Sequence, residues 1–241
     1  MIFYWKIQLK ELFGGKNKDM AINLKMPINK NLLSIPGIKL SSLSAGLNDK
    51  DRKDLMLMVF DDEAIVSGTF TQNKFCAAPV LISKKHLKST STIKALIVNT
   101  GSANAGTGDK GEEDAELICQ ALAIELKVSP NKVLPFSTGV IMTPLPVGKI
   151  QKAIPDLVKG LKENNWLEAA EAIMTTDTLP KAVSKSILIQ DQKVTITGIS
   201  KGAGMIHPNM ATMLAFISTD ANISLEMLQK LNKEIVDTTF N

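Results

Sequence analysis

The amino-acid sequence is compatible with an α/β fold, because strand-like and helix-like segments alternate along the chain. The six-residue apolar run Leu55–Phe60, bounded by Asp and Asn turn residues, predicts a buried central strand. The segment Glu112–Lys127 has the apolar spacing of an amphipathic helix. Lys185–Ile189 and Val194–Ile199 read as two strands joined by a short polar connection. The alternation agrees with an α/β protein but does not by itself prove one.

Length and composition place the chain among ordinary soluble globular proteins. Its 241 residues suit one large or two small domains, with 44% hydrophobic and 22% charged residues. A formal charge of +4 with scattered lysines gives little support for nucleic-acid binding. No apolar run approaches the roughly 20 residues of a membrane span. Cys76 and Cys119 have no paired spacing and read as reduced core thiols of a cytosolic protein. With only two histidines, a histidine-based metal centre is not expected.

The N-terminal part begins with a segment unlike the rest. Residues 1–19 end in a Gly/Lys-rich break and lack a signal-peptide cleavage site, so we expect an extension or a leader. The stretch Gly37–Gly46 then leads through a charged turn into the strand Leu55–Phe60. Ala64–Thr71 is expected to be the hairpin partner of that strand.

The next part contains strands, a loop of small residues and a helix. Pro79–Ser83 and Ala95–Val98 are expected to be short strands, separated by a polar loop that contains His86. Residues 99–108 follow a strand and precede a helix, so their backbone N–H groups could hold an anion. The simpler alternative is a small-residue connection. Helix Glu112–Lys127 is predicted to face the core and to carry its acidic start in solvent.

Thr138 and Gly139 follow the predicted strand Val133–Phe136. A glycine after a strand lets the backbone turn its N–H groups toward one point, and Thr138 adds a hydroxyl donor. Such donors hold a developing oxyanion, although a structural turn is the default explanation of the pair alone. Lys149–Lys162 and Asn165–Met174 are predicted to be helices.

Polar residues and a proline follow these helices, a pattern that normally just ends a helix. This segment, Thr175–Lys181, leads to the strands Lys185–Ile189 and Val194–Ile199. A last helix is expected after Ser224, a good N-cap residue.

The stretch Ser200–Asp220 organises the rest of the chain. It reads S-K-G-A-G-M-I-H-P-N-M-A-T-M-L-A-F-I-S-T-D and ends in a predicted buried strand, Met213–Ile217. If the bond between Ala211 and Thr212 breaks, Thr212 offers both a hydroxyl nucleophile and an adjacent α-amine base. Taken alone, this dipeptide more often simply precedes a strand.

Four motifs, in order, resemble those of one enzyme family. They are the loop at residues 99–108, the S-T-G-V-I-x-x-P-L-P segment from Ser137, the M-T-T-D-T-x-P-K segment from Met174, and the stretch Ser200–Asp220. All four are similar to motifs of the ornithine acetyltransferases of arginine biosynthesis, also called glutamate N-acetyltransferases. Ser102 stands where the family more usually has Asn, and Met142 where Gly is common. The resemblance covers roughly residues 20–241 and implies two packed central β-sheets flanked by helices.

The resemblance also implies residue roles and a mechanism. The precursor would cleave itself between Ala211 and Thr212, and Thr212 would carry the acetyl group from N-acetylornithine to glutamate. Thr138 and Gly139 would hold the oxyanion, while Thr175 and Lys201 would position substrate, Lys201 as a fixed positive charge for a carboxylate. His207 reads as a turn residue and not as a base.

The expected partners follow from the same resemblance. No cofactor or metal is expected, acetyl-CoA is a possible second acetyl donor, and the location is cytoplasmic. Self-assembly into two α and two β chains is expected, with no nucleic-acid or membrane partner.

One departure from the family pattern affects the domain organisation. Residues 20–211 correspond to the α chain and 212–241 to the start of the β chain, which in the family continues for well over a hundred residues. A truncated or split protein is therefore expected, with poor folding and no turnover by itself. Two alternatives stay open: a non-catalytic module, or a related N-terminal-nucleophile aminopeptidase.

Overall fold

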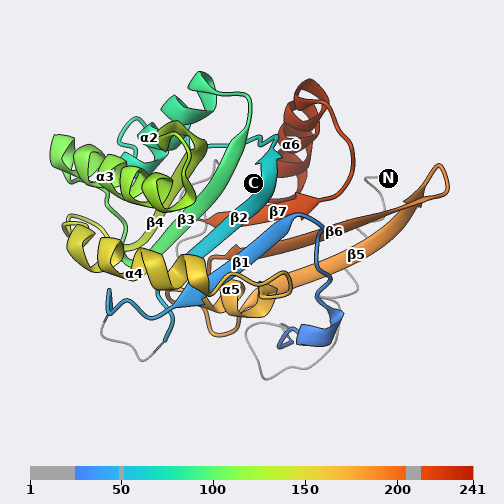
Figure 1. Ribbon diagram of the computed structural model, residues 1–241, viewed down its shortest axis with the longest axis horizontal. Helices are drawn as coiled ribbons and strands as arrows, with labels where there is room; N and C mark the ends of the chain where they lie inside the picture. The colour runs from blue at the N-terminus through green and yellow to red at the C-terminus, as the bar shows by residue number, and fades with distance from the viewer. Residues whose placement is uncertain (1–24, 49–51, 205–212, 241) are drawn as a thin grey trace.

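The computed structural model describes residues 25–48, 52–204 and 213–240, and it contains two β-sheets with helices on their outer sides (Figure 1). Sheet A has the strand order β1-β2-β3-β4, and sheet B has the order β5-β6-β7. The strands of sheet A are β1 (Ile38–Leu43), β2 (Leu55–Ala64), β3 (Ile93–Ser102) and β4 (Val133–Val140). Those of sheet B are β5 (Lys181–Ile189), β6 (Gln192–Lys201) and β7 (Leu214–Thr219). The α/β class and the two sheets are as expected.

The helices are α2 (Ala78–Ser89), α3 (Gly108–Leu126), α4 (Val147–Lys159), α5 (Trp166–Ala172) and α6 (Leu225–Thr239), with short 3₁₀ turns at Asn29–Asn31 and Pro130–Lys132. Helices α2, α3 and α4 cover one face of sheet A, α5 packs in the cluster that both sheets share, and α6 follows the last strand. Strands β3 and β4 are parallel and are joined through α3, whereas the other neighbouring strands are antiparallel. Parallel pairing needs such a long crossover, and it brings the carboxyl ends of β3 and β4 to the same edge.

Strand β2 separates two hydrophobic clusters because it is buried on both faces. Met56, Met58 and Phe60 point into a cluster that reaches Ile199 and Phe216 of sheet B. The alternate residues of β2 point into a second cluster with side chains of α2, α3 and α4. A strand covered on both faces reads as a continuous apolar run, which explains the pattern of Leu55–Phe60. The first cluster packs the two sheets together.

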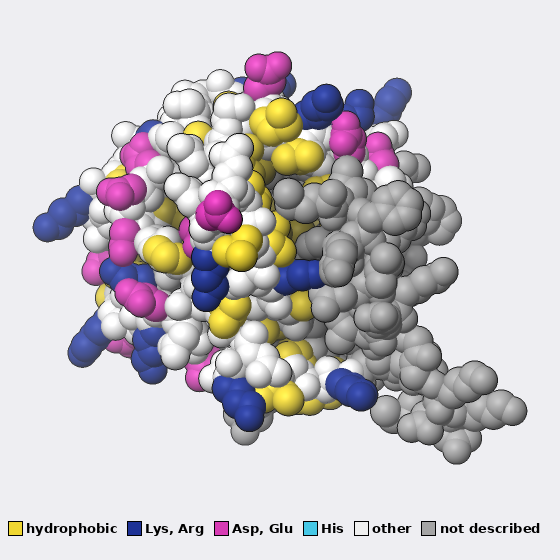
Figure 2. All heavy atoms as spheres, turned by 90° about the vertical axis from the view of Figure 1, so that its right-hand side faces the viewer, with side chains coloured by type: hydrophobic (Ala, Val, Ile, Leu, Met, Phe, Trp, Pro, Cys, Tyr) yellow, Lys and Arg dark blue, Asp and Glu magenta, His cyan; other side chains and the backbone are white. Residues whose placement is uncertain are grey.

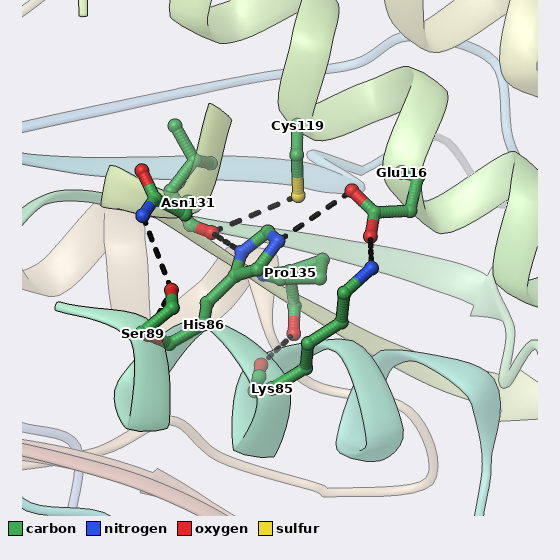
Figure 3. A network of polar contacts seen from close by, with 9 residues as sticks. Lys85, His86, Ser89, Glu116, Cys119, Asn131 and Pro135 are labelled. Carbon is green, nitrogen blue, oxygen red and sulfur yellow. Dashed lines mark hydrogen bonds and ion pairs between the residues drawn. The ribbon is translucent and has the colours of Figure 1, made fainter. Parts of the chain in front are cut away.

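Both edges of sheet A are capped. At one edge, Leu40 of β1 exchanges two backbone hydrogen bonds with Lys162, with N···O distances of 2.8 and 2.9 Å. At the other edge, the β4 carbonyl groups of Val133 and Pro135, two residues apart, point the same way. His86 Nδ1 donates to the first (2.7 Å) and Ser83 Oγ to the second (2.9 Å) (Figure 3). Pro135 has no N–H group, so this outer edge lacks one strand donor.

The structure corrects the prediction for residues 78–89, which form a helix and not a strand followed by a loop. Ala78, Ile82 and His86 are buried at four-residue spacing, the spacing of a helix face. Pro79 lies in the first turn of α2, where a proline is tolerated. The sequence interpretation took a short apolar run after a proline for a strand and missed this longer period.

The predicted hairpin Ala64–Thr71 was also wrong. Strand β2 continues through Asp61 and Asp62 to Ala64, and residues 65–71 form no strand. Both sides of β2 are already occupied by β1 and β3. The charged residues therefore mark the exposed end of a long strand and not a turn.

Three further expectations need smaller corrections. Strand β7 was expected to be buried, but in this strand only Phe216 is buried. Helix α3 begins at Gly108 and buries Asp114, so its acidic start is only partly in solvent. Cys119 is buried and burial raises the pKa of its thiol, whereas Cys76 is half-buried and donates to the Asn73 carbonyl oxygen (2.7 Å). Only Cys119 is thus a core thiol.

The remaining elements agree with the sequence apart from their ends. The predicted strands at residues 95–98, 133–136, 185–189 and 194–199 lie within β3, β4, β5 and β6. The last helix begins at Leu225, with the Ser224 side chain accepting a hydrogen bond from the Met227 backbone N–H group. Figure 2 shows the side of the molecule that carries α6 and the tip of the β5–β6 hairpin, where hydrophobic side chains form a band between charged ones.

Candidate active site

Four residues predicted for the site line one cavity. Thr138, Gly139, Thr175 and Lys201 contribute to the wall of a cavity of about 1900 Å³. Residues of both sheets and of α6 complete this wall. The cavity therefore brings together segments that lie more than 60 residues apart along the chain.

Thr138 and Gly139 end strand β4 beside the end of strand β3. In the parallel register Thr138 lies opposite Thr100, and Gly139 lies opposite Gly101. Thr138 is buried, and the Thr100 hydroxyl donates to the Ala172 carbonyl oxygen at 2.6 Å. The end of α5 thus holds β3 at the level of the predicted oxyanion donors.

Gly139 is required for two independent reasons. Its φ of +140° lies in a region that residues with side chains rarely adopt. A Cβ atom at this position would also stand 2.3 Å from the Gly101 carbonyl oxygen. Gly101 is constrained in the same way, because its φ is +124° and a Cβ atom there would stand 2.6 Å from the Leu47 carbonyl oxygen. This glycine pair lets two strands and a loop meet closely at the cavity wall.

Side chains of β3 fix the segment that carries Thr138. Ser137 Oγ donates to Asn99 Oδ1 (2.6 Å), and Asn99 Nδ2 donates to the Ser102 carbonyl oxygen (2.9 Å). Ser102 Oγ in turn donates to the Thr143 carbonyl oxygen at 2.8 Å. These hydrogen bonds hold the chain on both sides of the predicted oxyanion pair.

Hydrogen bonds fix the start of the small-residue loop after β3. Its Ala103 N–H group donates to the Val140 carbonyl oxygen (2.9 Å), and its Asn104 N–H group donates to Ser102 Oγ (3.1 Å). Met142 N donates to the Ala105 carbonyl oxygen (2.7 Å) with a left-handed φ of +58°. Glycine adopts that conformation without strain, whereas a residue with a side chain such as Met142 rarely does. The N–H groups of Ala103 and Asn104 are therefore bound within the protein and are not free to hold an anion.

Asp177 connects Thr175 to the end of strand β6. Its buried carboxylate accepts hydrogen bonds from the backbone N–H groups of Thr175 (3.2 Å) and Gly202 (2.8 Å). Lys181 Nζ adds an ion pair at 2.5 Å. Burial alone would raise the pKa of Asp177, but these three donors outweigh it and lower the pKa. The carboxylate is therefore charged and holds Thr175 beside Lys201.

Lys201 is a buried cation at the end of β6. Only 5% of the residue is exposed, and burial lowers the pKa of its ammonium group. The nearby charges of Lys181 and Arg52 lower this pKa further, whereas the Asp177 carboxylate opposes the change. Among the ion pairs of the described residues, Asp177 is bound by Lys181 and not by Lys201. The ammonium group of Lys201 thus lines the cavity in a positively charged environment.

The predicted nucleophile and cleavage bond lie outside the described residues, as does His207. Ala211 and Thr212 immediately precede Met213, which lines the cavity. Leu214, the first residue of β7, pairs with Lys201 in the strand register.

Sequence reasoning gave no role to three residues at the cavity or beside it. Asp177 and Gly101 stood within recognised motifs, whereas Arg52 stood in the charged turn before Leu55. For Asp177 and Gly101 the signal is their place inside a family motif, but no such signal marks Arg52 in the sequence. Only the fold shows what each of them contacts.

The part of the chain that the structure describes shows neither a cluster of metal-binding side chains nor a helix that could span a membrane. No group of three or more His, Cys, Asp and Glu side chains in this part of the chain is arranged to hold a metal ion. No helix within the same residues is long and apolar enough to cross a membrane.

The fold and the site together define an α/β protein with two sheets. Gly101 and Gly139 meet at the ends of two neighbouring strands, and the buried Lys201 lines the same cavity. Residues 39–241 match the model of the ArgJ family. The chain belongs to this family.

Individual relatives agree with this assignment. The arginine biosynthesis bifunctional protein ArgJ of Colwellia psychrerythraea is 47% identical over 232 residues, covering 92% of this chain and 55% of that protein. The chain thus spans about half the length of the curated relatives it matches.

Two solved structures share the fold. The crystal structure of arginine biosynthesis bifunctional protein ArgJ from Bacillus halodurans has a TM-score of 0.69 at 34% identity, covering 73% of this chain and 92% of that one. The structure of ornithine acetyltransferase complexed with ornithine from Mycobacterium tuberculosis has a TM-score of 0.68 at 32% identity. It covers 78% of this chain and 99% of the chain compared.

Proposed function

We propose that this chain is part of an enzyme that transfers an acetyl group from N-acetylornithine to glutamate in arginine biosynthesis. The observation that carries the proposal is the convergence of Thr138, Gly139, Thr175 and Lys201 on one cavity. Membership of the ArgJ family supports it, and so does the likeness to an ornithine acetyltransferase that was solved with ornithine. Because the chain spans about half of its curated relatives, the activity is proposed for the complete protein.

The proposed reaction begins with self-cleavage between Ala211 and Thr212. The Thr212 hydroxyl attacks the Ala211 carbonyl carbon, the peptide C–N bond breaks to leave an ester and a free α-amine, and water hydrolyses the ester. This divides the chain into an α part (20–211) and the start of a β part (212–241). The Thr212 hydroxyl then attacks the acetyl carbonyl carbon, while its α-amine takes the hydroxyl proton. The C–N bond breaks, ornithine leaves with that proton on its amine, and an acetyl ester of Thr212 remains. The amine of glutamate attacks this ester and releases Thr212 again, which is a ping-pong sequence.

The roles of the other residues follow from their chemistry. Thr138 and Gly139 would donate hydrogen bonds to the oxyanion that forms when the carbonyl is attacked. Thr175 and Lys201 would position the substrate, with Lys201 opposite a carboxylate. The same proposal includes acetyl-CoA as a second acetyl donor. It also includes assembly of two α and two β chains and a cytoplasmic location.

The first test is the intact mass of the purified chain beside the Thr212→Ala variant. We expect the unmodified chain to give one fragment that ends at Ala211 and one that begins at Thr212. The Thr212→Ala variant should remain uncut, because it lacks the hydroxyl that attacks the preceding bond. Thr238→Ala, a change at an exposed residue of α6, is the control and should cleave normally.

An uncut unmodified chain would contradict self-cleavage in this chain. Acetyl transfer from N-acetylornithine to glutamate is then assayed beside aminopeptidase activity. Aminopeptidase activity without transfer would favour a related N-terminal-nucleophile hydrolase. A stable fold without either activity would favour a non-catalytic module.

A further inference from the structure

Arg52 lines the same cavity and contacts the candidate substrate residue Thr175. Its Nη2 atom donates to the Thr175 carbonyl oxygen at 3.1 Å. Its Nε atom is buried and has no hydrogen-bond partner among the described residues. A buried donor that lacks a partner is unfavourable, because it has lost its hydrogen bonds to water. Arg52, a residue that lines the cavity, thus keeps one guanidinium donor that its described neighbours do not satisfy.

The charge around Arg52 is unbalanced. Arg52, Lys181 and Lys201 act together on this part of the cavity, because the charges of Arg52 and Lys181 both lower the pKa of Lys201. The carboxylate of Asp177 is the opposing charge, and it is occupied by Lys181 and by two backbone N–H groups. Within the described residues, no ion pair is formed by Arg52. An anion is therefore the complementary ligand for this side of the cavity.

We infer that Arg52 binds the α-carboxylate of the amino-acid substrate together with Lys201. The inference rests on the proposed function, because both N-acetylornithine and glutamate carry an α-carboxylate. A guanidinium group presents several N–H donors in a fixed plane, which matches the two oxygens of a carboxylate. Lys201 contributes a point charge, and Arg52 contributes orientation. Because Arg52 also binds the Thr175 carbonyl oxygen, one side chain positions both the substrate and a substrate-binding residue.

Binding measurements with two matched ligands test this assignment. N-acetyl-L-ornithine and its α-carboxamide differ at one group, where the carboxamide has a neutral NH2 in place of a charged oxygen. Both ligands are titrated calorimetrically into the full chain. We expect Arg52→Gln to lower the affinity for the carboxylate ligand by about tenfold to a hundredfold, since charge-assisted hydrogen bonds are lost. The affinity for the carboxamide should change less than threefold, because glutamine keeps a donor for the Thr175 carbonyl oxygen. Arg52→Lys should give an intermediate loss, because the charge stays and the planar fork does not.

Lys53→Gln is the matched control, because it removes the same charge from the next residue. Lys53 pairs with Glu168 and is absent from the cavity wall, so its substitution should leave both affinities unchanged. If Arg52→Gln lowers the affinity for both ligands equally, or for neither of them, the assignment is overturned. If the unmodified chain binds neither ligand, both the assignment and the proposed function fail for this chain. If the unmodified chain binds the carboxylate ligand and Arg52→Gln binds it with the same affinity, only the Arg52 assignment is contradicted.

Discussion

At the scale of single residues, the Asp177 carboxylate holds two separate parts of the candidate site together. It accepts N–H donors from the Thr175 and Gly202 backbones and an ion pair from Lys181. Its side chain is fully buried, so each of these partners replaces a water molecule that the carboxylate has lost. Removing one partner of a buried charge leaves the others unsatisfied, which is unfavourable by several kcal/mol.

Asp177→Asn should lower the free energy of unfolding by about 2–3 kcal/mol at neutral pH. The pKa of Asp177 is lowered in the folded protein, so its contribution is present above the unfolded pKa near 3.8 and is lost as the pH falls through the folded pKa. The difference between the two proteins should therefore shrink below about pH 4. Thermal unfolding at several pH values measures this difference.

Asp191→Asn is the control for this change. Asp191 is exposed in the turn between β5 and β6 and has a left-handed φ of +63°, which asparagine also tolerates. Its substitution should change the stability by less than about 0.5 kcal/mol. An Asp177→Asn effect of that size, independent of pH, would contradict the bridging role.

At the scale of elements, helix α2 supports the strand that ends in Thr138. Ser83 and His86 lie one turn apart on the buried face of the helix, and they bind the Pro135 and Val133 carbonyl oxygens of β4. Because a carbonyl oxygen only accepts hydrogen bonds, His86 carries its proton on Nδ1. Its Nε2 atom then faces Glu116 of α3 at 3.5 Å (Figure 3). A helix pair thus fixes the outer edge of β4 near the candidate site.

Ser83→Ala should destabilise the protein by about 1–3 kcal/mol, because it leaves the Pro135 carbonyl oxygen buried without its donor. Ser89→Ala is the matched control, since Ser89 is exposed on the same helix. The control should change the stability by less than about 0.5 kcal/mol. Urea unfolding of the three proteins measures both effects, and equal midpoints for the two variants would refute the edge-capping role of Ser83.

The same helix shows where sequence reasoning reached its limit. Residues with one dominant local pattern, such as Leu55–Phe60 and the helix that begins at Leu225, were assigned correctly because the pattern alone determines the element. The segment from Ala78 to Ser89 mixes a short apolar run with lysines, so its helical period is weak and its partners decide the outcome. Hydrogen bonds to β4 are contacts over long sequence separation, and no local pattern reports them.

The candidate site divides in the same way. Thr138, Gly139, Thr175 and Lys201 were recognised from family motifs, and the fold brings them to one cavity. The roles of Asp177 and Arg52 could not be predicted, because they depend on which backbone groups of other segments they contact. Gly101 was likewise only a small residue in the sequence, and its close approach to Gly139 requires the parallel register of two strands.

At the scale of the whole molecule, an aromatic pair connects the two sheets. The rings of Phe136 in β4 and Phe216 in β7 meet edge to face, with ring centroids 5.0 Å apart. Both belong to the hydrophobic cluster that contains side chains of both sheets. Because Phe136 lies two residues before Thr138, this contact also supports the wall of the candidate site. The two sheets should therefore unfold as one cooperative unit.

Phe216→Ala should lower the free energy of unfolding by about 3–4 kcal/mol through lost burial and a remaining cavity. Far-UV circular dichroism and tryptophan fluorescence should give the same shifted midpoint, as expected for two-state unfolding. Ile217→Ala is the control, because Ile217 is the next residue of β7 and is 50% exposed. Its effect should stay near 1 kcal/mol or below. Separate midpoints for the two probes would show that the sheets unfold independently.

The capped edges of sheet A have a consequence for aggregation. An open strand edge is a template on which another chain can add a strand, and proteins block such edges with proline, side chains or loops. In sheet A, β1 is paired with Lys162, and β4 presents Pro135 and carbonyl groups already bound by α2. Within the described residues, β7 has a strand neighbour only on its β6 side. Amyloid-like growth or domain swapping would therefore start at sheet B, and a lysine placed on β7 should suppress it where the same change on β4 has no effect.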